Sequence, residues 1–226
     1  MKRKEENKRA LIVDAMEALI KNGLGASCTV SEIAKTAKIG KGNVYYYFKS
    51  KEEIETALVE RTYRSFADNC KWVLDVPLNA LEKMILLCET FFNQSLNSEI
   101  DAYVHLLQNA ELYKKMLDLI VVGLAPLASK ILEQGHLSGE LTCTLPDEYA
   151  HIIFSVITYL VDPLFTRKTI EEARKLLIAF SGMMEASLKT PENAVIVLSE
   201  KLLEYLLGFK RFVAMFKDEA TEENPL

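Results

Sequence analysis

Apolar residues recur every three or four positions along most of the 226-residue chain, which is the pattern of helices that bury one face. Met16, Leu19 and Ile20 mark the first such helix, predicted over 5–22 and ended by Gly23 in a left-handed cap. Glycine and proline, at nine and six residues, are scarce. The pattern therefore predicts an all-α fold, with later helices at about 78–96, 99–109, 111–135, 146–164, 169–188 and 192–216.

Two helix-start signals bracket a short segment near the N-terminus. The stretch TVSE at 29–32 fits a capping box, in which the first side chain accepts a free amide and the glutamate reaches back, and SKEE at 50–53 repeats it. Between them the periodicity predicts one helix from Thr29 to about Ala37 and another over about 41–48. Two boxes about twenty residues apart thus predict a helix–turn–helix, followed by a helix that starts at Ser50 and continues through Trp72.

Four aromatic residues, YYYF at 45–48, end the second helix of this pair. At 100° per residue, Val44 and Phe48 point inward with Ile39, while Tyr46 points outward between Gly42 and Asn43. Tyr45 and Tyr47 lie on the two sides, where each either faces a partner or packs against neighbouring helices. A helical glycine costs about 1 kcal/mol relative to alanine, so Gly42 suggests close approach to another surface.

The charges divide unevenly along the chain. The net charge of −5 is the sum of +6 over residues 1–51 and −11 over residues 52–226. A basic N-terminal part on an acidic body favours a nucleic-acid partner over a merely solvated basic face. Tyrosine and lysine side chains bind phosphate, and asparagine can pair with adenine in the major groove. The basic residues behind the tyrosines are Lys35, Lys38, Lys41, Lys49 and Lys51.

Residues 9–58 resemble the DNA-binding domain of the TetR family of bacterial transcriptional regulators. The resemblance lies in TVSEIAKTAKIGKGNVYYYFKSKEEI: a threonine-capped helix, a tight turn, a short recognition helix ending in Tyr-x-x-Phe, and a following lysine. Two positions depart from the family, Lys38 where glycine is frequent in the turn and Gly40 where serine caps the recognition helix. A lysine in a left-handed turn costs about 1–2 kcal/mol unless Gly40 takes the strain instead. The resemblance implies DNA contacts by Thr29, Lys41, Gly42, Asn43, Tyr45, Tyr46, Tyr47 and Lys51.

The same resemblance implies a division of labour. Residues 1–50 would form the helix–turn–helix domain, and 51–226 a larger helical domain for ligand binding and dimerisation. The protein would be a ligand-responsive repressor that binds a palindromic double-stranded DNA operator as a homodimer and is released by a small hydrophobic or aromatic effector. The helices near 147–164 and 169–188 would form the dimer contact. The first of these is apolar almost all round, which calls for a partner on its second face.

Two features of the larger part stay open. The segment 192–216 either covers the ligand domain or extends the dimer. Asp147 and His151 lie one turn apart, but a surface pair is favoured over a metal site, and neither metal nor cofactor is expected. A ligand pocket is expected among aromatic and methionine residues that could equally be plain core: Phe66, Trp72, Phe91, Phe92, Tyr103, His105, Tyr113, Met116 and Phe154.

The sequence contains no motif typical of an enzyme or of a membrane protein. It has no Gly-rich phosphate loop, no paired Cys/His ligands and no nucleophile motif, so an enzyme is not expected. The four cysteines are far apart in sequence, which predicts reduced thiols and a cytoplasmic location. The apolar runs fall short of the about 20 residues of a membrane span, so no membrane contact is predicted. A structural DNA-binding protein of chromosome organisation remains the alternative, distinguished by many dispersed sites.

Overall fold

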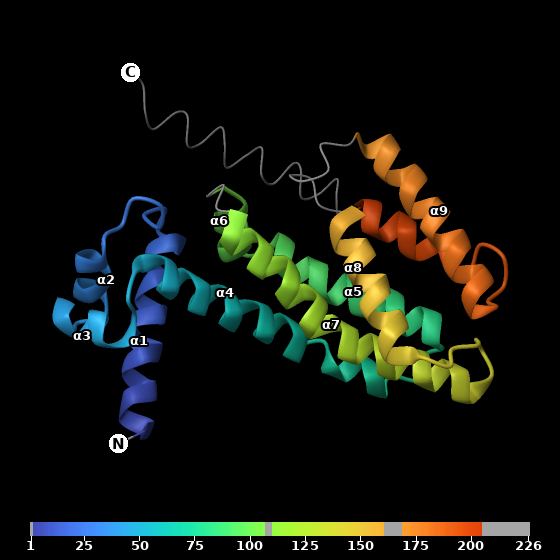
Figure 1. Ribbon diagram of the computed structural model, residues 1–226, viewed down its shortest axis with the longest axis horizontal. Coiled ribbons are helices and arrows are strands. Elements are labelled where there is room, and N and C mark those ends of the chain that lie inside the picture. Colours follow the sequence, from blue (N-terminus) through green and yellow to red (C-terminus); the bar gives the residue numbers. More distant parts are fainter. Residues whose placement is uncertain (1, 107–109, 161–168, 205–226) are drawn as a thin grey trace. The chain divides into compact units, whose positions relative to one another are not determined.

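The structure, a computed structural model, describes residues 2–106, 110–160 and 169–204 (Figure 1). Every regular element in these ranges is helical, which confirms the all-α prediction, and none of their helices is long and apolar enough to cross a membrane. Parts of the helices predicted at 99–109, 146–164 and 192–216 lie outside the described residues.

The elements are α1 (Lys2–Lys21), α2 (Val30–Thr36), α3 (Lys41–Tyr47), α4 (Lys51–Asp68), the 3-10 helix η1 (Lys71–Asp75), α5 (Ala80–Leu96), α6 (Glu99–Leu106), α7 (Ala110–Ser138), α8 (Pro146–Leu160), α9 (Ile170–Leu188) and a helical segment at 196–204.

The chain forms two compact units, and each draws on two separate segments. The first unit comprises Met1–Tyr63 and Ser98–Met116, and the second Arg64–Asn97 and Leu117–Leu226. Helices α4 and α7 therefore contribute residues to both units. The functional division at residue 50 stays a prediction, because compactness does not say which residues bind DNA.

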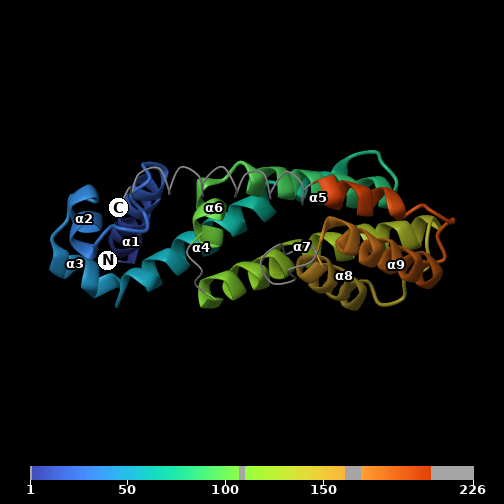
Figure 2. The ribbon, with the colours of Figure 1, turned by 90° about the horizontal axis from the view of Figure 1, so that it is seen from above.

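The first unit is built on α1, which contacts both α2 and α6, while α2 contacts α3 (Figure 2). Its core includes the fully buried Ile12, Met16 and Ile33. At the start of α2 the predicted capping box is present, with the Glu32 amide donating to Thr29 Oγ1 (3.3 Å) and the Thr29 amide to Glu32 Oε2 (2.7 Å). These local bonds fix where α2 begins.

Helix α2 ends in a Schellman motif whose left-handed residue is a lysine. The Ile39 amide donates to Ala34 O (3.0 Å) and the Lys38 amide to Lys35 O (3.1 Å), and Lys38 has φ +56°. Gly40 is extended, with φ −70°, and is the N-cap of α3. The strain predicted for this turn therefore lies on Lys38, and Gly40 does not relieve it.

Helix α4 departs from the sequence prediction at both ends. At its start the Glu53 amide donates to Ser50 Oγ (3.4 Å), but Glu53 Oε2 accepts from the Lys49 amide (2.6 Å) and not from that of Ser50. Its continuation through Trp72 was wrong: α4 ends at Asp68 and Trp72 lies in η1. In the last turn of α4 the carbonyl of Phe66 accepts from two side chains, the thiol of Cys70 (3.2 Å) and Nε2 of Gln94 of α5 (3.3 Å), which satisfy it where the helix ends.

The second unit packs α5, α7, α8, α9 and the 196–204 segment around a core that includes Leu87, Leu124 and Leu177, and α8 contacts α9. At Gly135 of α7 a Cβ would lie 2.5 Å from Cβ of Ala80, so this close approach of α7 to α5 requires glycine.

Polar links tie the 196–204 segment, and the residues just before it, to the rest of the second unit. Arg174 of α9 pairs with Glu200 (2.8 Å), and Lys201 pairs with Glu89 of α5 (3.2 Å). The carboxylate of Glu185 accepts from the backbone amides of Asn193 (3.1 Å) and Val195 (2.8 Å), just before the segment. The described part of the additional C-terminal helix therefore covers its own unit.

We expect Lys38→Gly to raise the free energy of unfolding by about 1 kcal/mol, because it removes the left-handed strain of a residue with a Cβ. Lys35→Gly is the matched control: Lys35 lies in α2, where glycine should lower stability by about 1 kcal/mol. Denaturant unfolding of the two variants measures both effects. Destabilisation by both substitutions would contradict a left-handed Lys38.

Candidate nucleic-acid interface

Helix α3, here called the reading helix, presents the outward face that the helical wheel predicts. Val44 is buried inside the unit, whereas Tyr46 is 73% exposed and Tyr45 49% exposed. Gly42 and Asn43 are also exposed. The face therefore offers an amide, two phenol rings and bare backbone to an outside partner.

Tyr47 takes an intermediate position on the reading helix. It is half-buried, and its ring meets that of Tyr46 edge-on, with centroids 4.9 Å apart. Arg9 of α1 donates from Nη1 to the carbonyl of Tyr47 (3.1 Å), and its guanidinium carbon lies 4.1 Å from the ring centroid of Phe48. A cation at the last turn of a helix is favourable both for its dipole and for its free carbonyls. Sequence reasoning counted Arg9 only as part of the basic charge and missed this role.

Among the described residues, nothing in the protein requires glycine at position 42. Apart from its chain neighbours and the backbone of its own helix, no described atom lies within 4 Å of the position that a Cβ would occupy there. Glycine in a helix lowers stability by about 1 kcal/mol relative to alanine, so a requirement from outside the chain is a natural reason for it. Close approach of another molecule to the backbone of the reading helix would supply that requirement.

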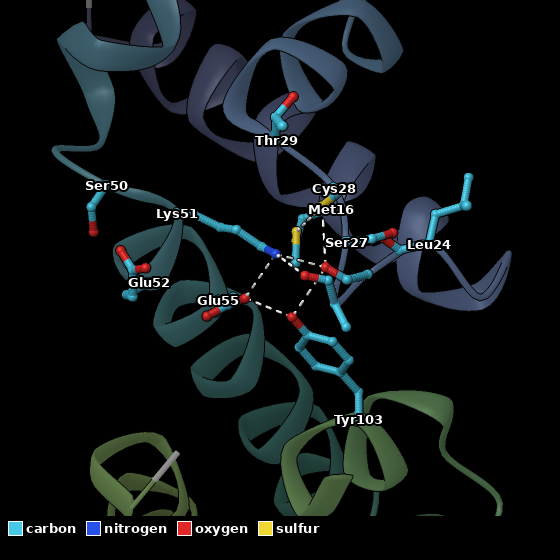
Figure 3. Close-up of polar contacts among 12 residues, drawn as sticks. Met16, Leu24, Ser27, Cys28, Thr29, Ser50, Lys51, Glu52, Glu55 and Tyr103 are labelled. Carbon is cyan, nitrogen blue, oxygen red and sulfur yellow. Dashed lines mark hydrogen bonds and ion pairs between the residues drawn. The ribbon is translucent and has the colours of Figure 1, made fainter. Parts of the chain in front are cut away.

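Two residues of the predicted DNA-binding set already have partners inside the first unit. The Thr29 hydroxyl donates to Glu32 Oε2 (2.9 Å), and the bonds from Thr29 lower the pKa of the Glu32 carboxyl. Lys51 Nζ donates to the carbonyl oxygens of Gly25 (2.8 Å) and Ala26 (3.0 Å) and lies 3.7 Å from Glu55 Oε1 (Figure 3). Two of the three donors of the ammonium group are therefore used in hydrogen bonds inside the first unit, and the ion pair with Glu55 holds its charge there as well. By contrast, Lys35, Lys38, Lys41 and Lys49 are exposed.

The residues predicted to line a ligand pocket divide between the two units. In the first unit His105 meets Tyr113 edge-on at 5.2 Å between ring centroids, and in the second Phe66 and Phe91 meet at 6.0 Å. Trp72 is 49% exposed on η1. Tyr103, His105, Tyr113 and Met116 belong to the first unit; Phe66, Trp72, Phe91, Phe92 and Phe154 belong to the second.

The second unit contains an apolar cavity that none of these nine residues lines. Its volume is about 40 Å³, and its walls come from α5, α7, α8, α9 and the C-terminal segment. Ser181 and Ser199 are its polar lining residues, and their hydroxyls bond to each other and to the carbonyl of Leu177. Met84 of α5 and Met184 of α9 are among the apolar lining residues.

A helix–turn–helix with an exposed, amide- and phenol-bearing second helix defines a DNA-binding protein. Comparison with known proteins gives the family. Residues 11–58 match the family described as bacterial regulatory proteins, tetR family. The chain is similar to the fatty acid metabolism regulator protein of Bacillus subtilis (strain 168), with 30% identity over 187 residues, 80% of this chain and 93% of the relative. The chain belongs to the TetR family.

Two further similarities agree with this assignment. The HTH-type transcriptional repressor NemR of Escherichia coli (strain K12) is 27% identical over 139 residues, 56% of this chain and 68% of that protein. The crystal structure of RolR in complex with resorcinol has the same fold, with a TM-score of 0.60 at 17% identity over 91% of this chain and 96% of that one. The protein is thus a ligand-responsive DNA-binding transcriptional regulator and not an enzyme.

We expect Gly42→Ala to separate folding from DNA binding. The free energy of unfolding should rise by about 1 kcal/mol, because alanine favours the helix and meets no neighbour. Binding to a cognate operator should weaken, because the new methyl group keeps DNA away from the backbone. Thermal melting and fluorescence anisotropy with labelled operator measure the two effects. A variant that is more stable and binds operator unchanged would show that DNA does not approach the backbone at this position.

Proposed function

We propose that the protein is a cytoplasmic repressor that binds a palindromic operator as a homodimer and is released by an effector with an apolar portion. The observation that carries the proposal is the exposed face of the reading helix, with Gly42, Asn43 and Tyr46 on it and no internal need for the glycine. Asn43 is suited to reading adenine, and the flanking tyrosines and Lys41 to holding phosphates. Two such helices in a symmetric dimer would enter successive major grooves about 34–36 Å apart.

A dimer contact is supported by apolar side chains on α8 and α9. Ile152 and Tyr159 of α8 are 56% and 57% exposed, and Met183 of α9 is 69% exposed. Ile152 and Tyr159 are seven residues apart, as are Leu176 and Met183, so each pair lies on one face of its helix. Neighbouring helices with such faces gain by burying them against a second copy.

The proposal predicts one or a few protected palindromes in the DNA flanking the protein's own gene. A footprint with purified wild-type protein tests this. Ile152→Asp should sediment as a monomer and lose the footprint, because a carboxylate cannot be buried unpaired in the dimer contact. Leu137→Asp is the matched control, since Leu137 is 78% exposed and belongs to α7, not to α8 or α9. Protection at many dispersed sites would instead favour a structural role in chromosome organisation.

An apolar effector is supported by the lining of the cavity in the second unit. A buried water needs roughly 10–15 Å³, so a volume of about 40 Å³ holds only a few such groups, and a larger ligand must move the walls. The methionines Met84 and Met184 can adapt at little cost. None of the described lining residues is charged, so a charged group of the effector would stay outside. The name of the relative, a fatty acid metabolism regulator protein, further supports an unbranched alkyl chain as the inserted part.

We expect saturated fatty acids of about six to sixteen carbons to release labelled operator, with affinity rising by about 0.8 kcal/mol per buried methylene until the cavity is full. Met184→Trp should fill the cavity and abolish both release and direct binding measured by calorimetry without DNA. Leu137→Trp, on an exposed position, should change neither. Release that is equally strong with Met184→Trp would exclude this cavity, and a folded wild type that binds no chain length would exclude the alkyl effector.

A further inference from the structure

A buried polar cluster joins three segments of the first unit (Figure 3). Lys51 and Glu55 come from the first turns of α4, Tyr103 comes from α6, and Gly25 lies in the loop between α1 and α2. Tyr103 donates its hydroxyl to Glu55 Oε1 (2.6 Å) and also lies 3.3 Å from the carbonyl oxygen of Gly25. Lys51 Nζ donates to the same carbonyl oxygen (2.8 Å), so side chains of both α4 and α6 meet at one backbone oxygen.

The charges of this cluster compensate each other inside the protein. Glu55 is 5% exposed and Tyr103 8% exposed. Burial raises the pKa of the Glu55 carboxyl, whereas the Tyr103 hydroxyl and the Lys51 ammonium act in the opposite direction. A buried carboxylate without such partners would be strongly unfavourable, so removal of either partner leaves the other groups of the cluster unsatisfied.

Position 25 requires glycine because side chains of α1 and α6 lie very close to its backbone. A Cβ on this residue would lie 2.5 Å from Cγ1 of Ile20 and 2.9 Å from Cε2 of Tyr103. The loop is therefore pressed between α1 and α6. Four residues later Thr29 caps α2, so the loop held at Gly25 leads directly into the helix–turn–helix.

The bonds from Lys51 close a ring around the helix–turn–helix. Lys51 follows the reading helix by four residues, and its two carbonyl partners precede α2, 26 and 25 residues back along the chain. Helices α2 and α3 both lie inside this closed segment. A closed segment has less freedom than an open one, so the ring restricts how the reading helix can tilt.

We propose that Lys51, Glu55 and Tyr103 are positioning residues for DNA binding, which hold the reading helix in place from inside the first unit and make its orientation depend on α6. The inference rests on the proposed operator-binding function. It reassigns Lys51, which the family resemblance implies to be a DNA contact, and Tyr103, which the sequence suggested for a ligand pocket. DNA affinity would then depend on a tyrosine that is buried and cannot touch DNA.

Salt dependence separates a positioning lysine from a phosphate-binding one. A side chain that neutralises a phosphate contributes about 0.9 to the slope of log K against log salt. A positioning residue lowers the affinity at every salt concentration and leaves the slope unchanged. The test therefore measures operator affinity by anisotropy between about 50 and 200 mM salt for the full-length dimer.

Lys51→Met keeps the aliphatic stem and removes all three donors, and Tyr103→Phe removes only the hydroxyl. Both should weaken operator binding by about tenfold with the wild-type slope, the loss expected for one hydrogen bond to a charged group. Lys49→Met is the matched control: Lys49 is exposed two residues away, and its loss should reduce the slope. Glu55→Gln, which retains an acceptor for Tyr103, should resemble Lys51→Met. Circular dichroism melting ensures that each variant is folded at the measuring temperature.

The outcomes distinguish this inference from the proposed function. If wild type binds operator, Lys51→Met lowers the slope by about 0.9 per subunit and Tyr103→Phe binds normally, Lys51 contacts phosphate and the positioning role is excluded. If Tyr103→Phe unfolds at the measuring temperature, Glu55→Gln takes its place: weaker operator binding with the wild-type slope supports the positioning role, and normal binding excludes it. If wild type protects no DNA, the proposed function fails, whatever the variants do.

Discussion

The carbonyl oxygen of Gly25 is the point on which the geometry of the first unit depends. It accepts from Lys51 Nζ (2.8 Å) and from the Cys28 thiol (3.2 Å), and it lies 3.3 Å from the Tyr103 hydroxyl oxygen, whose proton is donated to Glu55. A unit of this size has a small core, so apolar packing alone holds its elements only moderately well. Buried hydrogen bonds are directional, so they define a single arrangement of the helices and loops, which apolar contacts alone do not. The loop before α2, the start of α4 and α6 are therefore aligned by a single backbone group.

Sequence reasoning succeeded where the determinants are local. The Thr29 capping box needs only residues within one turn, and the inward direction of Val44 follows from helical periodicity, so both were predicted correctly. The end of α4 was missed because the Phe66 carbonyl is satisfied by side chains, the Cys70 thiol and the amide of Gln94, and Gln94 lies 28 residues away. Apolar residues continue past that end and hide it from a periodicity argument.

The same limit applies to the candidate site. The outward face of the reading helix could be predicted, whereas the partners of Arg9 and Lys51 could not, since a basic residue near a DNA-binding helix has the same sequence signal whether it faces inward or outward. Phe92 of the predicted pocket set lines one cavity of the second unit, whereas another, apolar cavity has no member of that set in its walls. Its walls run from Ala80 to Leu202 and include aliphatic residues that look like ordinary core. Aromatic composition therefore pointed to residues that the structure divides between two units.

Three exceptions to local folding rules lie at or beside the reading helix, although others, such as the left-handed Lys189 and the helical Gly182, lie in the second unit. Lys38 adopts φ +56° where glycine would be unstrained, Gly42 occupies a helix where alanine would be better, and Tyr46 exposes a large ring to solvent. At Gly42 no contact among the described residues compensates the cost, and at Tyr46 the edge-on contact with Tyr47 leaves the ring 73% exposed. Natural sequences break such rules mainly where function demands it. The strain at Lys38 has a different counterpart, because a lysine in this left-handed turn adds positive charge beside the exposed face. All three exceptions agree with the proposed polyanionic partner at this face.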